Sequence, residues 1–536
     1  MPATYTYPGL YVEEVPSGVR TIAGVSTAET AFIDFFLRGA VDRPQRVTSF
    51  GDFERNYGGL DERSEASYAV QQYYLNGGQI AWIVRVAPGN PGTASVALQT
   101  SSPPHTTLTV TAANPGQWGN RLQVAVAQSA GQATFDLFVR EAIIVTGKPA
   151  QVLNSETYRN LSMKKGDRQY CADVVNAASQ LVHIDDAGVG MPPAAWQSTA
   201  NGGAPEGAFQ SLKNGDDGNA FDSAGNLKDG SAMAAALRGD VTAKTGFHAL
   251  DRIDPFIFNI LSVPAAANLD ASTMNSLYTD LLGYCAQKRA FLIIDIPSSV
   301  TSVGDATHGM LGWMAANDTL RQPNAAVYFP RLKMPDLLND GRPRDVGPSG
   351  TIAGIFARTD GSRGVWKAPA GTDASLRNVN LVSGVNDLED GFLNPLGINV
   401  LRNFPIFGNV SWGARTLMGA DQQASEWKYI PVRRTALFIE ESLVEGLKWV
   451  VFEPNDEPLW AQIRLNVGAF MHDLFRQAAF QGQTPKDAYF VKCDKETTTQ
   501  TDIDRGIVNI LVGFAPLKPA EFVVIKIQQI AGQIQT

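Results

Sequence analysis

The stretch from residue 516 to 533, PLKPAEFVVIKIQQIAGQ, limits the possible fold of this chain more than any other feature. Its side chains alternate between two faces and are rich in β-branched types, a pattern that predicts a strand. The two faces carry, in turn, Phe522, Val524 and Lys526, and Val523, Ile525 and Ile527. A strand that is apolar on both faces must be paired and covered. We call this segment the C-terminal arm.

A second strand-like segment, the N-terminal arm, lies near the other end at residues 7–15. Its candidate pairing residues are Tyr7, Leu10, Tyr11, Val12, Glu13 and Val15. Two terminal arms built for pairing predict a subunit that is completed by its neighbours. The alternative is that both arms pair within their own chain, and the pattern alone favours neither.

The charge balance and the cysteines exclude several classes of function. The chain has 44 Lys and Arg against 53 Asp and Glu, which gives a net charge of −9. It contains no cluster of basic residues of the kind that would indicate nucleic-acid binding. The three cysteines are too scattered for a disulfide framework or a zinc pattern, which predicts folding in a reducing cytoplasm. We also expect no signal peptide and no membrane helix.

Strand-like and helix-like segments alternate through much of the chain between residues 25 and 386. This order predicts right-handed crossovers and a mostly parallel sheet. The predicted strands are 28–37, 79–87, 255–263, 290–296 and 325–332, and the predicted helices are 49–57, 64–75, 271–287, 303–320 and 349–358.

Composition divides the chain into several expected parts. Residues 91–244, rich in Thr, Ala, Gly, Asn and Asp, read as a β-rich outer domain inserted into an α/β core of 25–90 plus 245–386. Its predicted strands include 106–111, 122–127 and 133–140. The expected C-terminal domain, 387–516, contains helices at 434–452 and 458–480 and strands at 488–492 and 506–514. The arms, with their linkers, occupy 1–24 and 517–536. The fold class is therefore multi-domain α/β with an α+β C-terminal domain.

Several motifs, taken together and in this order, resemble those of contractile tail sheath proteins. The matching segments are 8–15, 114–120, 245–251, 347–371, 394–405, 427–460 and 518–527. The inserted region matches poorly apart from the residues around Trp118 and the motif LKNGDDG at 212–218. Both arms and the C-terminal domain lie in one chain, which favours a phage tail or a phage-tail-like injection particle over a sheath divided between two polypeptides.

The resemblance implies a structural protein that is not an enzyme. Sheath subunits stack as six-fold rings in a helix around an inner tube, with baseplate and cap or terminator proteins at the ends. Their arms add strands to sheets in neighbouring C-terminal domains. The linkers at 17–24 and 514–519 would then act as hinges during contraction.

The resemblance also implies that a helix of the C-terminal domain contacts the tube, largely through charge. The matching helix is 434–452, and its candidate tube-contact residues are Glu440, Glu441 and Glu445. The plainer interpretation of these residues is the solvated face of an amphipathic helix. Exposed charge pairs contribute ~1 kcal/mol or less each, so repetition around a ring would have to supply the strength.

A serine hydrolase is the enzymatic alternative. The parallel-sheet core of sheath proteins is similar to subtilisin-like domains, and Asp295, His308 and Ser349 follow the chain order of those proteases. Their sequence surroundings do not match, and helix capping and strand termination explain the residues equally well.

No motif predicts a cofactor or a metal. The chain has no phosphate-binding GxxxxGK[ST] loop, its histidines are scattered, and Gly215, Asp216 and Asp217 read as a turn. A non-contractile shell or tube protein is a third interpretation that stays open. The sequence also leaves open the kind of particle, which could be a phage, a bacteriocin or a toxin-delivery device. It does not determine the role of the inserted domain, the helical lattice or the trigger of contraction.

Overall fold

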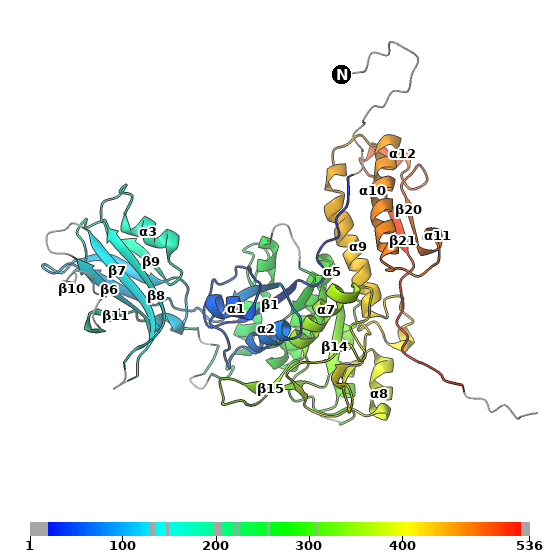
Figure 1. Ribbon diagram of the computed structural model, residues 1–536, viewed down its shortest axis with the longest axis horizontal. Coiled ribbons are helices and arrows are strands. Elements are labelled where there is room, and N and C mark those ends of the chain that lie inside the picture. Colours follow the sequence, from blue (N-terminus) through cyan, green and yellow to red (C-terminus); the bar gives the residue numbers. More distant parts are fainter. Residues whose placement is uncertain are drawn as a thin grey trace, which may run out of the picture. The chain divides into compact units, whose positions relative to one another are not determined.

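The computed structural model describes residues 20–128, 134–145, 149–194, 196–197, 206–218, 220–222, 225–253, 258–305 and 308–526. The chain forms two compact units (Figure 1). The larger unit is Ser26–Arg433, and the smaller one combines the N-terminal end of the chain up to Val25 with the part that begins at Arg434. Within the described ranges, no helix is both long enough and apolar enough to cross a membrane.

The larger unit is built on an eight-stranded sheet, which confirms the predicted parallel sheet. The strand order is β19-β18-β14-β13-β12-β1-β3-β2. All neighbours from β18 to β3 are parallel, and only the edge strands β19 and β2 are antiparallel to theirs. The bounds are β1 Thr30–Phe35, β2 Gln45–Val47, β3 Ala81–Val86, β12 Ile260–Ser262, β13 Phe291–Ile294, β14 Ala325–Phe329, β18 Asn399–Phe404 and β19 Gly408–Ser411.

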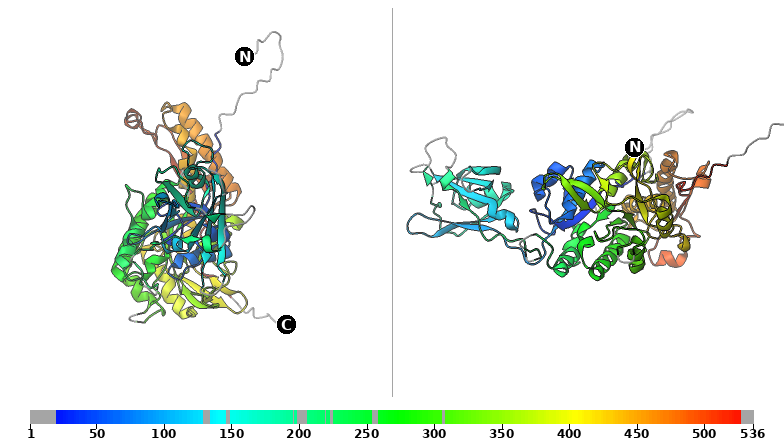
Figure 2. Two further views of the ribbon diagram at one scale, coloured as in Figure 1. Left: turned by 90° about the vertical axis from the view of Figure 1, so that its left-hand side faces the viewer. Right: turned by 90° about the horizontal axis from the view of Figure 1, so that it is seen from below.

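Helices cover both faces of this sheet, as the right-hand view of Figure 2 shows. Alternation along the buried strands divides their side chains between the two layers. Ile33 of β1 belongs to the hydrophobic core that α5 covers, whereas the Phe32 ring lies 5.6 Å from that of Tyr73 in α2. The helices of the unit outside the inserted region are α1 Phe50–Tyr57, α2 Glu65–Leu75, α4 Gly230–Arg238, α5 Ala271–Gln287, α6 Met310–Ala316, α7 Ser349–Arg363 and α8 Asp387–Leu393.

Two core predictions were wrong in extent. The helix expected at 303–320 is only Met310–Ala316, and the strand expected at 325–332 ends at Phe329. Pro330 follows β14 and has no N–H for a sheet hydrogen bond. The chain then enters a small separate sheet, β16-β15-β17, with bounds β15 Leu332–Asp336, β16 Arg342–Val346 and β17 Asn380–Leu381.

The inserted region has its own hydrophobic core around the buried Trp118. Two sheets enclose it, β4-β5-β9 and the sheet of β10, β6, β7 and β8, to which β11 adds through β6. The bounds are β4 Ser95–Gln99, β5 Thr106–Ala112, β6 Leu122–Gln128, β7 Phe135–Ile143, β8 Gln151–Leu161, β9 Val182–Asp186, β10 Trp196–Gln197, β11 Gln210–Ser211 and α3 Cys171–Ala178.

Two expected domain boundaries differ from the structure. Helix α4 falls inside the expected insertion of 91–244, yet its Met233 and Leu237 belong to the core of the large sheet. The C-terminal domain was expected from residue 387, yet the compact units divide only at Arg433. The reason is that β18 and β19 extend the large sheet, with Tyr328 of β14 opposite Asn399.

The smaller unit contains two long helices and a two-stranded sheet. Helix α9 was expected at 434–452 but runs from Ile430 to Gly446, and the boundary between the units falls inside it. Helix α10, expected at 458–480, buries apolar residues at helical spacing that include Ile463, Val467 and Leu474. The bounds are α9 Ile430–Gly446, α10 Glu457–Arg476, α11 Pro485–Ala488, α12 Gln500–Asp504, β20 Tyr489–Lys492 and β21 Leu511–Phe514.

Candidate assembly surfaces

The described part of the C-terminal arm forms no strand in this chain. The side chains of Phe522, Val523, Val524 and Ile525 are 75%, 81%, 78% and 80% exposed. Lys526 is also exposed, and Ile527 lies outside the described residues. Four consecutive large apolar side chains in water are an unfavourable arrangement for a soluble chain and typical of a binding segment.

The C-terminal arm begins beside the sheet of β20 and β21. These strands are antiparallel, with Tyr489 opposite Phe514, and each has only the other as a strand partner among the described residues. After β21, the Ala515 N–H donates to Ala488 O and the Gln481 N–H donates to Ala515 O. A two-stranded sheet with two open edges is marginally stable alone and can accept further strands.

The chain just after the N-terminal arm is fixed to the smaller unit. Ile22 is buried, and the Arg20 N–H donates to Asn466 Oδ1 at 3.0 Å, while the Arg20 guanidinium lies 4.5 Å from the centre of the Trp449 ring. A Cβ added to Gly446 would lie 2.5 Å from Ile22, so this close approach requires glycine. Residues 20–24 of the expected hinge at 17–24 are therefore packed against the smaller unit in this structure. The predicted pairing residues 7–15 lie outside the described residues.

The three tube-contact candidates on α9 have different surroundings. Glu441 is only 7% exposed, whereas Glu440 and Glu445 are partly exposed. Lys448 Nζ donates to Glu445 Oε2 at 2.7 Å. Of the three candidates, the structure thus leaves Glu440 and Glu445 partly exposed.

The possible catalytic residues do not form a triad. Ser349 Oγ donates directly to Asp295 Oδ2 at 2.5 Å, and both residues are buried. The His308 ring is more than half exposed, and its Nδ1 lies 3.4 Å from Asp305. Burial and the charge of Glu65 raise the pKa of Asp295 to about 7. With its proton committed to Asp295 and no access to solvent, Ser349 has a structural role here.

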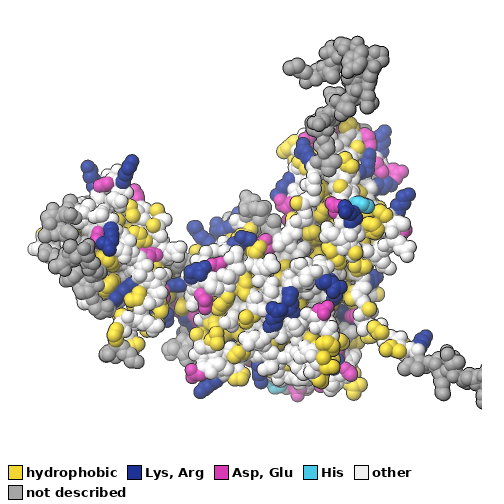
Figure 3. Space-filling view, viewed as in Figure 1, with side chains coloured by type: hydrophobic (Ala, Val, Ile, Leu, Met, Phe, Trp, Pro, Cys, Tyr) yellow, Lys and Arg dark blue, Asp and Glu magenta, His cyan; other side chains and the backbone are white. Residues whose placement is uncertain are grey.

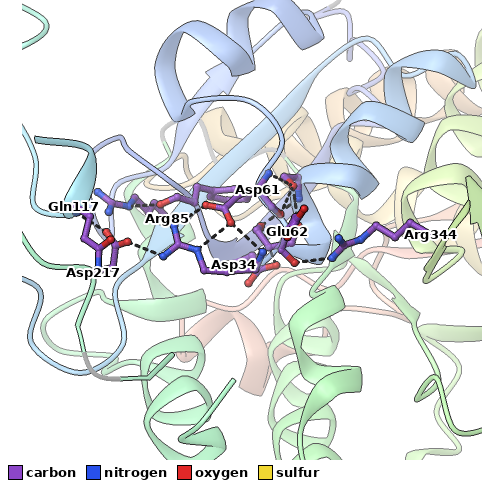
Figure 4. A network of polar contacts seen from close by, with 11 residues as sticks. Asp34, Asp61, Glu62, Arg85, Gln117, Asp217 and Arg344 are labelled. Atoms are coloured by element: carbon purple, nitrogen blue, oxygen red, sulfur yellow. Dashed lines mark hydrogen bonds and ion pairs between the residues drawn. The ribbon is translucent and has the colours of Figure 1, made fainter. Parts of the chain in front are cut away.

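The Gly-Asp-Asp turn holds a contact that the sequence did not predict. Asp216 Oδ1 accepts the Gly218 N–H at 2.7 Å, which confirms the turn. Asp217 accepts hydrogen bonds from Arg63 Nη1 and from the Gln117 N–H, both at 2.7 Å, and so ties the inserted region to the core (Figure 4). Among the described residues, no group of three His, Cys, Asp or Glu side chains could hold a metal ion.

Comparison with known proteins now shows what the chain is similar to. Residues 422–530 match the phage tail sheath C-terminal domain. Over 190 residues, 35% of this chain, the sequence is 29% identical to the tail sheath protein of Vibrio phage KVP40. The C-terminal part of the chain is thus similar to that of tail sheath proteins. The aligned segment spans only 27% of the length of that curated relative.

Solved structures extend the likeness to nearly the whole fold of this chain. A chain of the anti-feeding prophage baseplate is 22% identical with a TM-score of 0.55, covering 98% of this chain and 100% of the other. A chain of the contracted sheath complex of the extracellular contractile injection system PVC is 21% identical with a TM-score of 0.56, covering 98% of each chain. The resemblance seen in the sequence is therefore confirmed, and the shared architecture is a multi-domain α/β fold with a parallel sheet.

Proposed function

We propose that this protein is the structural subunit of a contractile sheath. Copies stack as six-fold rings in a helix around an inner tube, between a baseplate and a cap, and contraction drives the tube through a target envelope. The family match and the likeness to a sheath in its contracted state support this function. The particle is assembled in a bacterial cytoplasm and becomes part of a phage tail or of a tail-like particle.

The exposed C-terminal arm is the observation that carries the proposal. It combines strand-forming residues, no strand over its described part up to Lys526, and a neighbouring sheet whose outer edges pair with no other described strand. Adding the arm of one copy to the β20–β21 sheet of another satisfies backbone groups on both sides. Each hydrogen bond contributes ~0.5–1.5 kcal/mol net, and burial of Phe522 and Val524 adds to that. The N-terminal arm is proposed to pair in the same way.

Removal of the arm tests this exchange. Deletion of residues 522–530 should leave soluble monomers in the presence of tube protein, because each copy then lacks the strand that its neighbour needs. A matched control deletes only residues 532–536 and should assemble as the full chain does. Negative-stain electron microscopy and sedimentation measure the outcome, and sheaths of normal length from the longer deletion would contradict the proposal.

We further propose that Glu440 and Glu445 contact a basic surface of the tube. The joint change Glu440→Lys and Glu445→Lys should abolish assembly on the tube, because like charges then face each other around every ring. Glu453→Lys, at an exposed residue beyond α9, is the control. Co-sedimentation with tubes at low and high salt measures the effect, and binding that the joint change leaves intact would reject this assignment.

The core is proposed to be a non-catalytic relative of subtilisin-like folds. Its parallel strands, with Asp295 after β13 and Ser349 at the start of α7, support that relation. The direct hydrogen bond between the two side chains supports a purely structural role. Labelling of Ser349 by a serine-reactive probe would count against it.

A further inference from the structure

The turn between β15 and β16 exposes two leucines. Leu337 is 68% exposed and Leu338 is 51% exposed. Turns of this kind usually carry Gly, Pro, Asn, Asp or Ser at such positions, so two large apolar side chains need a reason. We call Leu337 and Leu338 the leucine knob.

The leucine knob is held rigidly. Asp336 is buried, and its Oδ1 accepts hydrogen bonds from the Leu338 N–H at 3.0 Å and from the Tyr68 hydroxyl at 2.9 Å. Arg344, across the hairpin, lies 3.5 Å from Asp336 and donates to the Glu62 carbonyl at 2.6 Å (Figure 4). Because these contacts already fix the turn, its leucines lose little conformational entropy when they bind a partner.

Helix α8 exposes a second apolar surface in the same unit. Leu388 and Phe392 lie one helical turn apart and are 81% and 63% exposed. A capping box between Asn386 and Glu389 fixes the start of the helix. Arg402 Nη1 donates to Asp387 Oδ1 at 2.6 Å and holds the helix against β18. We call Leu388 and Phe392 the α8 patch.

The charges around the two surfaces are opposite in sign. Lys333 and Arg342 are exposed on the hairpin of the leucine knob, against one exposed acid, Asp340. Beside the α8 patch lie three acids in the first turn of the helix, and Arg402 forms ion pairs with two of them. These acids are Asp387, Glu389 and Asp390. Apolar centres with opposite charges at their rims are complementary.

Figure 1 draws the β15 hairpin and α8 at opposite sides of the lower edge of the larger unit, and Figure 3 shows hydrophobic side chains among charged ones at both places. We propose that the leucine knob of one copy docks on the α8 patch of the next copy. Two different surfaces that meet head to tail generate rings or helices, which an isologous contact does not. The inference rests on the proposed function, because a sheath is what brings copies side by side.

Disulfide cross-linking tests the contact directly, since all three native cysteines are buried. A chain carrying both Leu338→Cys and Phe392→Cys should give a ladder of covalent oligomers when assembled particles are oxidised. An equal mixture of the two single variants should give dimers only, and each single variant alone should give none. Leu338→Cys combined with Ser272→Cys, an exposed residue of α5, is the matched control and should stay monomeric on denaturing gels.

The outcomes separate this contact from the sheath function. Particles that form normally without a ladder would overturn the contact and leave the sheath proposal standing. Dimers from one single variant alone would also overturn it, since they need a self-pairing surface. If the unmodified chain forms no particles on tubes, the sheath proposal fails. The double variant is then oxidised as concentrated free chain, where a ladder supports the contact and its absence overturns it.

Discussion

At the scale of single residues, the most consequential groups are carboxylates buried in the larger unit. Asp34 lies in β1 and Asp295 follows β13, and burial raises the pKa of each to about 7. Glu65, at the start of α2, accepts hydrogen bonds from Arg331 Nη2 at 2.5 Å and from the Gly347 N–H at 2.6 Å, and its charge raises both pKa values further. The core therefore contains acids whose pKa values lie well above the usual range of a carboxyl, so they stay protonated at mildly acidic pH.

This burial predicts a pH dependence of stability. Because the pKa of Asp295 is raised from 3.8 to about 7 on folding, its contribution is fully present below pH 3.8 and is lost as pH rises through 7. Asp295→Asn imitates the protonated carboxyl, so the loss of stability between pH 5 and pH 8 should shrink by roughly 2–3 kcal/mol. Urea unfolding of the arm-deleted chain at several pH values measures it.

The control for this prediction is Asp340→Asn, at an exposed turn residue of the same unit. It should leave the pH dependence as it is in the parent chain. An unchanged pH dependence in Asp295→Asn would show that Asp295 is ionised in the folded chain.

At the scale of elements, residues 20–25, which follow the N-terminal arm, are packed into the smaller unit. We call this segment the root of the arm. Ile22 fills a place that exists only because residue 446 has no side chain, and Gly24 similarly lets the backbone approach Phe438. The Val25 N–H donates to Ser442 Oγ of α9 at 3.1 Å. The arm therefore leaves the body from a fixed point, which sets how far it can reach.

Gly446→Val should displace this root. The added Cβ would lie 2.5 Å from Ile22, so Ile22 must leave its buried place, at a cost of about 1.5–3 kcal/mol. Hydrogen exchange at residues 20–25 and assembly on tubes should both report the change. Gly468→Ala in α10 meets nothing within 4 Å and is the control. Unchanged exchange at residues 20–25 in the valine variant would contradict the prediction.

At the scale of the whole molecule, the two compact units carry different surfaces for the proposed assembly. The smaller unit carries the exposed C-terminal arm and the open β20–β21 sheet, and the larger unit carries the leucine knob and the α8 patch. In the proposed mechanism, strand pairing persists through contraction while the contacts of the larger unit are exchanged.

This division predicts two helical lattices from the same copies. Electron microscopy of particles before and after brief treatment with acid or urea should show sheaths of different pitch and diameter, with the strand pairing intact in both. Glutaraldehyde-fixed particles, which cannot rearrange, are the control. A single lattice under all conditions would instead support a non-contractile shell.

The sequence alone determined the elements whose patterns are local. The apolar runs of β1, β3 and β13, the helical spacing of apolar residues in α10 and the turn at Asp216 depend on neighbours along the chain, and a single sequence is enough to recognise them. The sequence motifs that resemble those of tail sheath proteins could also be recognised from the sequence alone, because each motif is a short run of neighbouring residues.

Only the tertiary structure decided which of these residues are accessible and what they contact. It buried Glu441, joined Ser349 directly to Asp295, added β18 and β19 to the large sheet and paired Arg63 with Asp217 across 154 residues of sequence. The physical reason is that burial and ion pairing depend on segments far apart in the chain, whose approach leaves no periodic trace in the sequence of either one.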